Sequence, residues 1–567
     1  MNKNQMIGIA LLLLLLNIFF VRINKDNNEN IKKDNIEINK TENKNESDNK
    51  NENDIVEKAS TNRDTADNLR ADKAKALNLK NDYDDVNNEN FILENDYIKY
   101  TFSNIGASIV DVELKKFKNH KGQNVKLVEN NSLIMAFDFR RFNINTNKLS
   151  FNETISNDKS ITFKFTDIDD HNIIITYELD ENNPYVIKQN VKSSDNNFVD
   201  YKFNALLIQN EKYLEDCKNK ASLNYYQENK DFKTINNVDL KTNKTKQDIK
   251  HCEWISYKQK FFTIGMTCDT LMNGETYIKY NKDYVDEYDS SVTFTDNVDN
   301  IQLKYYFGPN ELKYFYTFHN TFDKNIYLGM IGVGSFNKYI ILPMAKTIGK
   351  KCGAVLFLIL LVLLIKLLLL PINYKLFVIT KKMQLLSKLL TVLGNKYKNN
   401  QQQLAIEQIN AYRDLGINPL SMILFNFIQF PFVIAIYNYI PLDFLYRNCS
   451  FLWCSDLASY DSIFNLGFYI PLYGDHISLS ALLMAVTMFI YMISNGTTNE
   501  NDKKISPIYI IFVVFILCIS NRFCCALNIY YLIFNIVTFI NQYIFSKKID
   551  IRPFENKVNN KIKKLTF

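Results

Sequence analysis

Hydrophobic residues are unevenly distributed along the 567-residue chain, and the first apolar segment lies at the N-terminus. Residues 6–21 are mainly apolar and are flanked by Lys3 and Arg22, a pattern typical of a signal peptide or a signal anchor. No small-x-small cleavage pattern precedes the polar region, so we expect residues 1–23 to form an uncleaved transmembrane anchor with a cytoplasmic N-terminus. Residues 24–90 are polar and rich in asparagine, which predicts a disordered tether, because such a segment buries too little apolar surface to offset ordering its backbone.

Residues 91–336 show a second pattern, in which apolar and polar positions alternate. Alternation in segments rich in β-branched and aromatic residues is typical of β-strands. It is clearest at residues 98–102, 110–114, 161–165 and 199–203. Short strands separated by Asn, Asp and Gly predict a large all-β domain, an antiparallel sandwich, whose core we expect to include Trp254, Phe261 and Phe262. Neither paired carboxylates nor a nucleophile with a nearby base stands out in this domain, so we assign it no catalytic chemistry.

The last third of the chain contains long apolar segments. Residues 337–351 interleave apolar side chains with lysines, which predicts an amphipathic helix at the membrane interface. Residues 352–372 are long and apolar enough for a helix that crosses ~30 Å of hydrocarbon. In residues 373–416, apolar positions recur every three or four residues, which predicts a helical hairpin outside the membrane. Gly416 suits the end of that hairpin, and Pro419 suits the first turn of the next helix.

Four further apolar segments lie within residues 417–545, so that with the anchor the sequence predicts six transmembrane helices. They are residues 420–440, 479–494, 507–520 and 526–545. The hairpin and the basic tail at residues 546–567 each carry seven lysines and arginines against two acidic residues. The loop at residues 441–477 carries only Arg447 against four aspartates. By the positive-inside rule, we expect the hairpin and both termini to be cytoplasmic, and the loop and the β domain to be periplasmic.

Composition narrows the possible function classes. A net charge of +6 is modest for this length, and it provides no basic surface of the kind that nucleic-acid binding requires. The nine cysteines form no CxxC pair and the five histidines lie far apart in sequence, so we expect neither a metal nor another cofactor. Cys217, Cys252 and Cys268 could form a disulfide in an oxidising compartment, in a pairing that the sequence leaves open.

Lys366 lies inside the apolar segment at residues 352–372, where a lysine is unexpected. A charged side chain at the centre of a spanning helix costs roughly 2.5–3.5 kcal/mol. Such a residue therefore indicates a water-accessible or paired site, or else a side chain that reaches the nearby interface. The later segments carry polar side chains at spacings that place them on one helix face. They are Asn426 and Gln429; Thr487, Tyr491 and Ser494; and Asn535, Thr538, Asn541 and Gln542, with Tyr530 and Tyr531 one turn before.

We hypothesise that these polar faces surround a hydrophilic groove that contains Lys366 and binds a substrate. The candidate groove residues are Lys366, Asn426, Gln429, Thr487, Tyr530, Tyr531, Asn535 and Thr538. The alternative is that the amides and hydroxyls hydrogen-bond between helices, at about 0.6 kcal/mol each. That alternative is favoured for any one residue, whereas a lysine together with polar faces on several helices favours the groove.

The order of these features and several short motifs resemble the YidC/Oxa/Alb family of membrane protein insertases. The anchor and external β domain are followed by Lys366 five residues before a proline, the basic hairpin, and the motifs INPL, FNFIQFP and IYYLIFNIVTFINQY. The similarity covers nearly the whole chain and is most specific in its last 230 residues; in the β domain WISYKQKFF matches best. Two positions depart from the family pattern: Lys366 replaces a groove arginine, and Ala526-Leu527 replaces a Gly-Leu pair.

The resemblance implies a multi-span α-helical protein of a bacterial inner membrane, with a periplasmic β-supersandwich and five core helices around a groove open to lipid and cytoplasm. Its implied function is non-enzymatic: it moves nascent membrane proteins into the phospholipid bilayer, alone or with the Sec translocon, and it could also contact the ribosome. The alternatives are a secondary transporter of an anionic solute and an envelope enzyme whose β domain binds carbohydrate. Five core spans show no internal repeat of the kind that transporters have.

Overall fold

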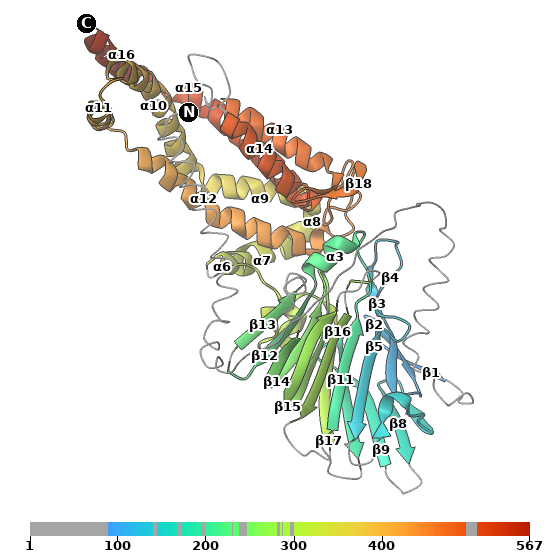
Figure 1. Ribbon diagram of the computed structural model, residues 1–567. Coiled ribbons are helices and arrows are strands. Elements are labelled where there is room, and N and C mark those ends of the chain that lie inside the picture. Colours follow the sequence, from blue (N-terminus) through green and yellow to red (C-terminus); the bar gives the residue numbers. More distant parts are fainter. Residues whose placement is uncertain are drawn as a thin grey trace, which may run out of the picture. The chain divides into compact units, whose positions relative to one another are not determined.

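The computed structural model describes residues 89–566, which belong to one compact unit of the chain, with several internal gaps. The gaps are residues 140–143, 167–171, 194–198, 230, 237–245, 280–283, 286, 295–299, 331 and 495–506. The predicted anchor at residues 1–23 and nearly all of the predicted tether at residues 24–90 lie outside the described residues. Figure 1 shows the β domain in blue to yellow-green and the later helices in yellow to red.

The β domain begins with a four-stranded antiparallel sheet in the order β1-β2-β3-β4. Its strands are β1 (Asn90–Glu94), β2 (Ile98–Ser103), β3 (Ser108–Lys118) and β4 (Asn124–Val128). Alternate side chains of β2 are fully buried, and these are Ile98, Tyr100 and Phe102. The period-two pattern in the sequence therefore arises from a sheet with one face against a core.

A second sheet follows, with 13 strands in the described part of the chain. The order of its main path is β6-β5-β11-β16-β15-β17-β10-β9-β8-β7, and β14 joins β12 and β13 to β15. Its strands are β5 (Leu133–Phe139), β6 (Ile144–Asn145), β7 (Glu153–Ser156), β8 (Ser160–Thr166), β9 (Asn172–Leu179), β10 (Val186–Ser193), β11 (Val199–Leu206), β12 (Ser222–Gln227), β13 (Asp231–Asn236), β14 (Lys246–Lys258), β15 (Phe262–Lys279), β16 (Glu287–Phe294) and β17 (Asn300–Pro309). Short helices accompany the strands: η2 (Thr146–Lys148), α3 (Leu214–Lys220), α5 (Leu312–Phe318) and η3 (Phe322–Asn325).

Aromatic side chains fill the core of this domain. Trp254, Phe261 and Phe262 are each at most 1% exposed, which confirms their predicted place in the core. The three cysteines of the domain are free thiols: Cys217, Cys252 and Cys268. The disulfide considered among them is therefore not formed.

A helical connection leads from the β domain to the apolar helices. It consists of α6 (Val333–Phe336), η4 (Asn337–Ile341), α7 (Leu342–Met344), η5 (Ala345–Gly349) and α8 (Lys350–Cys352). The expected amphipathic helix at residues 337–351 is thus helical, with Ile341 and Ala345 buried and Tyr339 exposed. It ends at Gly353, whose positive φ of 85° suits glycine.

The predicted span at residues 352–372 is not one straight helix. It comprises α9 (Ala354–Leu368) and the start of α10 (Leu370–Lys396), and the two helices meet at 65°. Pro371 causes the break, because it has no N–H for a helical hydrogen bond and its ring would clash with the carbonyl of Leu367. The hairpin partner of α10 is α11 (Gln401–Asp414), and Gly416 follows it with a φ of +61°, as the sequence predicted.

Four apolar helices follow, close to their predicted bounds. They are α12 (Pro419–Tyr439), α13 (Leu479–Ser494), α14 (Pro507–Ser520) and α15 (Cys525–Lys548). Among the described helices, α15 alone is long and apolar enough to cross a membrane by itself, and α9 with α10 qualifies as a bent pair. Six transmembrane helices therefore stay a prediction. Between α12 and α13 lie η6 (Ile440–Leu442), η7 (Phe444–Tyr446), β18 (Phe464–Ile470) and β19 (Gly474–Ile477).

The predicted basic tail at residues 546–567 is largely helical. After α15 ends at Lys548, α16 (Arg552–Thr566) packs on α10 (Figure 1). A small separate core joins α10, α11 and α16, and it includes Leu386, Leu389, Leu393, Ala411 and Val558. The expectation of a simple tail missed this helix, although Phe554, Val558, Ile562 and Leu565 recur at helical spacing.

Candidate functional site

The Lys366 side chain is buried between two helices. It projects from the last turn of α9, and the residue is only 3% exposed. Its Nζ donates a hydrogen bond to the Thr538 hydroxyl of α15 and lies 3.2 Å from the centroid of the Phe534 ring. Among the described residues, no carboxylate forms an ion pair with Lys366. Within the described part of the chain, the ammonium group thus has a hydroxyl and an aromatic face as partners but no counter-ion.

Helical geometry explains why α15 presents this pair of side chains. Phe534 and Thr538 are four residues apart, so they lie on the same face of α15. Thr538 donates its hydroxyl hydrogen to the Phe534 carbonyl at 2.6 Å, which leaves the oxygen lone pairs free to accept from Lys366. We call Lys366, Phe534 and Thr538 the Lys366 cluster. Phe534 was not among the residues predicted from the sequence, although its spacing from Thr538 is a signal for it.

Asn535 makes a separate contact with α13. It lies about 100° around α15 from Phe534, since an α-helix has about 3.6 residues per turn. Its Nδ2 donates to the Thr487 hydroxyl at 3.3 Å, and Thr487 donates to the Met484 carbonyl at 2.8 Å. Thr538 and Asn535, one turn apart on α15, therefore form polar contacts with two different helices, α9 and α13.

Tyr530 and Tyr531 lie one turn before the Lys366 cluster on α15. Tyr530 is buried, and its ring contacts those of Tyr531 at 5.3 Å and Phe534 at 6.0 Å. The Tyr531 hydroxyl donates to the Val433 carbonyl of α12 at 3.4 Å. The structure therefore gathers six of the eight candidate residues on or against α15.

The two remaining candidates lie on α12. Gln429 is partly exposed, and no hydrogen bond joins it to the Lys366 cluster in the described part of the chain. The side chain of Asn426 is outside the described part, as is that of Ser494 on α13. The polar contacts seen here are direct bonds between helices, so a water-filled groove beside Lys366 stays a prediction.

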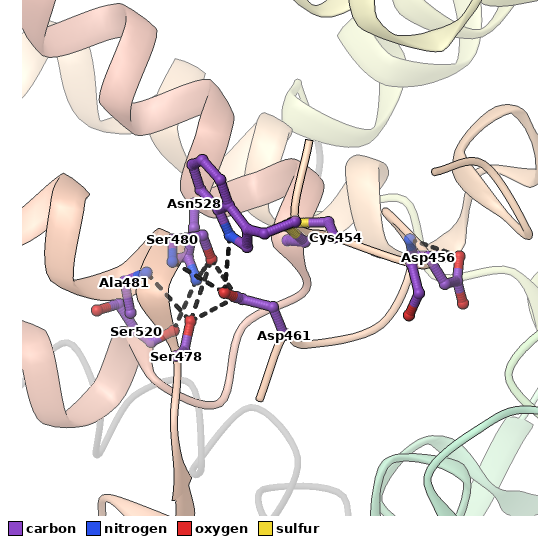
Figure 2. Close-up of a disulfide and its surroundings, with 12 residues drawn as sticks. Cys454, Asp456, Asp461, Ser478, Ser480, Ala481, Ser520 and Asn528 are labelled. Atoms are coloured by element: carbon purple, nitrogen blue, oxygen red, sulfur yellow. Dashed lines mark hydrogen bonds between the residues drawn. A yellow bond between two sulfur atoms is a disulfide. The ribbon is translucent and has the colours of Figure 1, made fainter. Parts of the chain in front are cut away.

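A disulfide between Cys454 and Cys525 joins the loop after α12 to the first residue of α15. Beside it, the Asp461 carboxylate accepts hydrogen bonds from the Ser478 hydroxyl at 2.6 Å, the Ser480 amide at 3.0 Å and the Trp453 indole at 3.0 Å. Figure 2 shows Asp461, Ser478 and Ser480 converging next to the disulfide.

The same polar network extends to the ends of three helices. The Asn528 amide on α15 donates to the Ser480 hydroxyl at 3.0 Å and to the Ser520 carbonyl at the end of α14 at 3.1 Å (Figure 2). The Ser478 hydroxyl accepts from the Ala481 amide at 3.1 Å and so caps the first turn of α13. No pattern in the sequence predicted this network, because only the fold brings its members together.

The Cys454 and Cys525 sulfurs and an Asp461 oxygen lie within 4.8 Å of one another, close enough for metal ligands. The residues nevertheless do not fit a metal site. The sulfurs are joined in a disulfide, so neither is a thiolate. The carboxylate oxygens already accept hydrogen bonds from serines and tryptophan.

Comparison with known proteins assigns the chain to a family. A model of the 60Kd inner membrane protein family matches residues 344–552, and a model of the YidC periplasmic domain matches residues 91–342. The Membrane protein insertase YidC of Amoebophilus asiaticus is 32% identical over 505 residues, which cover 84% of this chain and 83% of that protein. The chain belongs to the YidC family of membrane protein insertases.

Other relatives are similar over the same extent. The Membrane protein insertase YidC of Azobacteroides pseudotrichonymphae is 26% identical, over 81% of this chain and 80% of that protein. A crystal structure of an active YidC insertase with its first transmembrane domain resolved covers 84% of this chain, at 13% identity and a TM-score of 0.30. By the two family models, the β domain matches the YidC periplasmic domain, and the helices from α8 to α15 lie within the match to the 60Kd inner membrane protein family.

Proposed function

We propose that this chain inserts nascent membrane proteins into a bacterial inner membrane, and that the Lys366 cluster receives polar parts of the inserting segment. Insertion is the function of the YidC family, to which the chain belongs. The observation that supports the site is a buried lysine with no carboxylate partner among the described residues. An ionisable side chain inside a spanning helix is a functional-site hypothesis by default, since its burial is costly.

The chemistry of the cluster suits acidic and polar side chains of a client. An approaching carboxylate could replace Thr538 as the partner of Lys366, and a charge-assisted hydrogen bond is stronger than a bond to a hydroxyl. Thr538 would then keep its bond to the Phe534 carbonyl. Binding at this site should be transient, because the client must leave for the bilayer.

The outward face of α9 provides the apolar path to lipid. Leu356, Leu360, Leu363 and Leu367 are 37–69% exposed and follow one another at helical spacing. A client helix could move along this face while its polar parts stay near Lys366, which lies about a quarter of a turn around α9 from these leucines. Transfer of apolar surface out of water drives the step, with help from the membrane potential, so neither a nucleotide nor a metal is needed.

The expected topology is also part of the proposal. A disulfide in the loop at residues 441–477 supports a periplasmic place for that loop, since stable disulfides form in oxidising compartments. The basic unit of α10, α11 and α16 would then face the cytoplasm, by the positive-inside rule. Contacts with the Sec translocon and with the ribosome are further predictions, which rest on the family resemblance alone.

Site-specific photocrosslinking tests the proposed site. A photoreactive residue is placed at Lys366, at Gln429 or, as the matched control, at Ile511 on α14, which is 64% exposed and lies outside the proposed path. With a ribosome-bound nascent membrane protein, we expect stronger crosslinks from positions 366 and 429 than from position 511. Equal crosslinking from all three positions would contradict a defined receiving site.

A further inference from the structure

The β18–β19 hairpin, residues 463–477, presents large apolar side chains to its surroundings. Phe464, Phe468, Tyr469 and Leu472 are each 60–63% exposed. Phe468 and Tyr469 are consecutive in β18, and consecutive strand residues point to opposite faces. The strand β18 is therefore apolar on both faces, which differs from an ordinary strand with one face on a core.

Hydrogen bonds hold the base of this hairpin at the ends of three helices. The Asn521 side chain, in the turn between α14 and α15, donates to the Tyr473 carbonyl at 3.0 Å and to the His476 carbonyl at 2.7 Å. Its Oδ1 accepts from the Ser478 amide at 2.9 Å, immediately before α13. The hairpin is thus fixed beside the first turns of α13 and α15 and the last turn of α14.

The amino-acid composition of the hairpin indicates that it contacts a lipid surface rather than a protein partner. Residues 462–474 contain no Lys, Arg, Asp, Glu or His, whereas charged residues make up 23% of the whole chain. A segment without charge offers no electrostatic selectivity to a protein partner. Aromatic side chains with polar tips, such as Tyr469, are enriched where membranes meet water.

We propose that the β18–β19 hairpin inserts into the outer leaflet of the membrane at the level of the headgroups and upper acyl chains. The hairpin then anchors the outer ends of α13, α14 and α15, with Phe468 and Leu472 in the lipid and the Asn521 contacts at its base. This inference rests on the proposed placement of α13 in the membrane.

Tryptophan fluorescence in liposomes tests the proposal with the full-length chain. Phe468→Trp and Tyr469→Trp place the probe on either face of β18, and the parent emission from Trp254 and Trp453 is subtracted. Vesicles contain phosphatidylcholine brominated either close to the headgroup or near the chain end. We expect lipid brominated close to the headgroup to quench the added emission about twofold, and more strongly than lipid brominated near the chain end.

Two control variants separate the possible failures. Ile155→Trp lies on β7 in the β domain, is 55% exposed and should not be quenched by either lipid. Val486→Trp on α13, which is 52% exposed, should be quenched if α13 lies in the membrane. Quenching at position 486 with none at 468 and 469 would overturn the hairpin proposal alone. A blue-shifted but unquenched probe would indicate that protein, such as a second copy, covers the hairpin, and would also overturn it.

Discussion

At the scale of single residues, the burial of Lys366 lowers the stability of the folded chain. Its amine is removed from water and contacts the Thr538 hydroxyl and the Phe534 ring. Neither of these groups neutralises the charge. A cation–π contact of this kind contributes about 2 kcal/mol when desolvated, which is less than the roughly 2.5–3.5 kcal/mol cost of the charge in a spanning helix. A residue kept for stability alone would be apolar here.

The substitution Lys366→Leu should have opposite effects on stability and on function. The free energy of unfolding in detergent should rise by about 1–3 kcal/mol, because an uncompensated charge is removed from an apolar helix. Insertion of a client with acidic residues should fall by roughly tenfold, as loss of one charge-assisted hydrogen bond implies. Thermal unfolding and an in vitro insertion assay measure the two effects.

Lys375→Gln is the matched control for this experiment. Lys375 is exposed on α10, beyond the bend at Leu369, so its loss should leave both stability and insertion near the parent values. If Lys366→Leu lowered stability while insertion stayed normal, Lys366 would be a structural residue and the proposed site would be wrong.

The neighbouring cysteines give a second prediction at the residue scale. Burial raises the pKa of the Cys524 thiol to about 11, so at neutral pH it is protonated and does not attack the adjacent disulfide. Cys524→Ser should therefore keep the Cys454–Cys525 bond. Cys525→Ser should lose it, at a cost of about 2–5 kcal/mol.

Peptide mapping and thermal unfolding measure these outcomes in the oxidised, full-length protein. Because thiolate forms only as the pH approaches 11, exchange between Cys524 and the disulfide should begin in alkaline buffer and be absent near pH 7. A Cys454–Cys524 crosslink in Cys525→Ser at pH 7 would show that Cys524 is more accessible than its burial indicates.

At the scale of elements, α16 completes the hairpin of α10 and α11. Val558 is 1% exposed in the small core with Leu386, Leu389 and Leu393. Lys396 donates to the Leu565 carbonyl at 2.9 Å, and Lys561 forms an ion pair with Asp414 of α11. The apolar contact carries most of this packing, since exposed ion pairs contribute little.

Val558→Asp should therefore detach α16 from the hairpin. Burying an unpaired carboxylate costs more than about 2 kcal/mol, so amide hydrogen exchange should accelerate across α16 and the facing turns of α10. Asn559→Asp adds the same charge at an exposed neighbouring position and should leave exchange unchanged. Equal exchange in the two variants would mean that α16 does not depend on this core.

The sequence predicted elements well where periodicity alone defines them. The bounds of α13 and α14 agree with the predicted apolar segments, and Pro419 begins α12 as expected. The order of the second sheet could not be predicted, because pairs such as β11 with β16 join strands far apart in the chain. The Cys454–Cys525 disulfide and the Asp461 network also join residues far apart in the chain, so they could not be predicted either. The bend after α9 is caused by Pro371, which the predicted span at residues 352–372 included.

At the scale of the whole molecule, buried charges connect the β domain to the loop at residues 441–477. Arg447 Nε donates to a Glu211 carboxylate oxygen at 2.8 Å, and both side chains are at most 5% exposed. Lys260 Nζ donates to the Ala458 carbonyl at 2.7 Å and to Asp216 at 2.5 Å. Burial alone would lower the pKa of Lys260, but Asp216 raises it, so the amine stays charged.

Removing one partner of the Arg447–Glu211 pair should loosen this connection strongly. In Arg447→Met the Glu211 carboxylate is left buried without its cation, a change that costs about 3–5 kcal/mol. At about 1.4 kcal/mol per factor of ten, amide exchange in residues 443–461 should accelerate on the order of a hundredfold or more. The double variant Arg447→Met with Glu211→Leu removes both charges and should recover most of the protection, because apolar residues can replace a buried ion pair without loss.

Lys159→Ala, which breaks a fully exposed ion pair with Glu181, should have no effect on this loop. If the double variant exchanged as fast as the single one, the pair would act through specific geometry rather than through charge compensation.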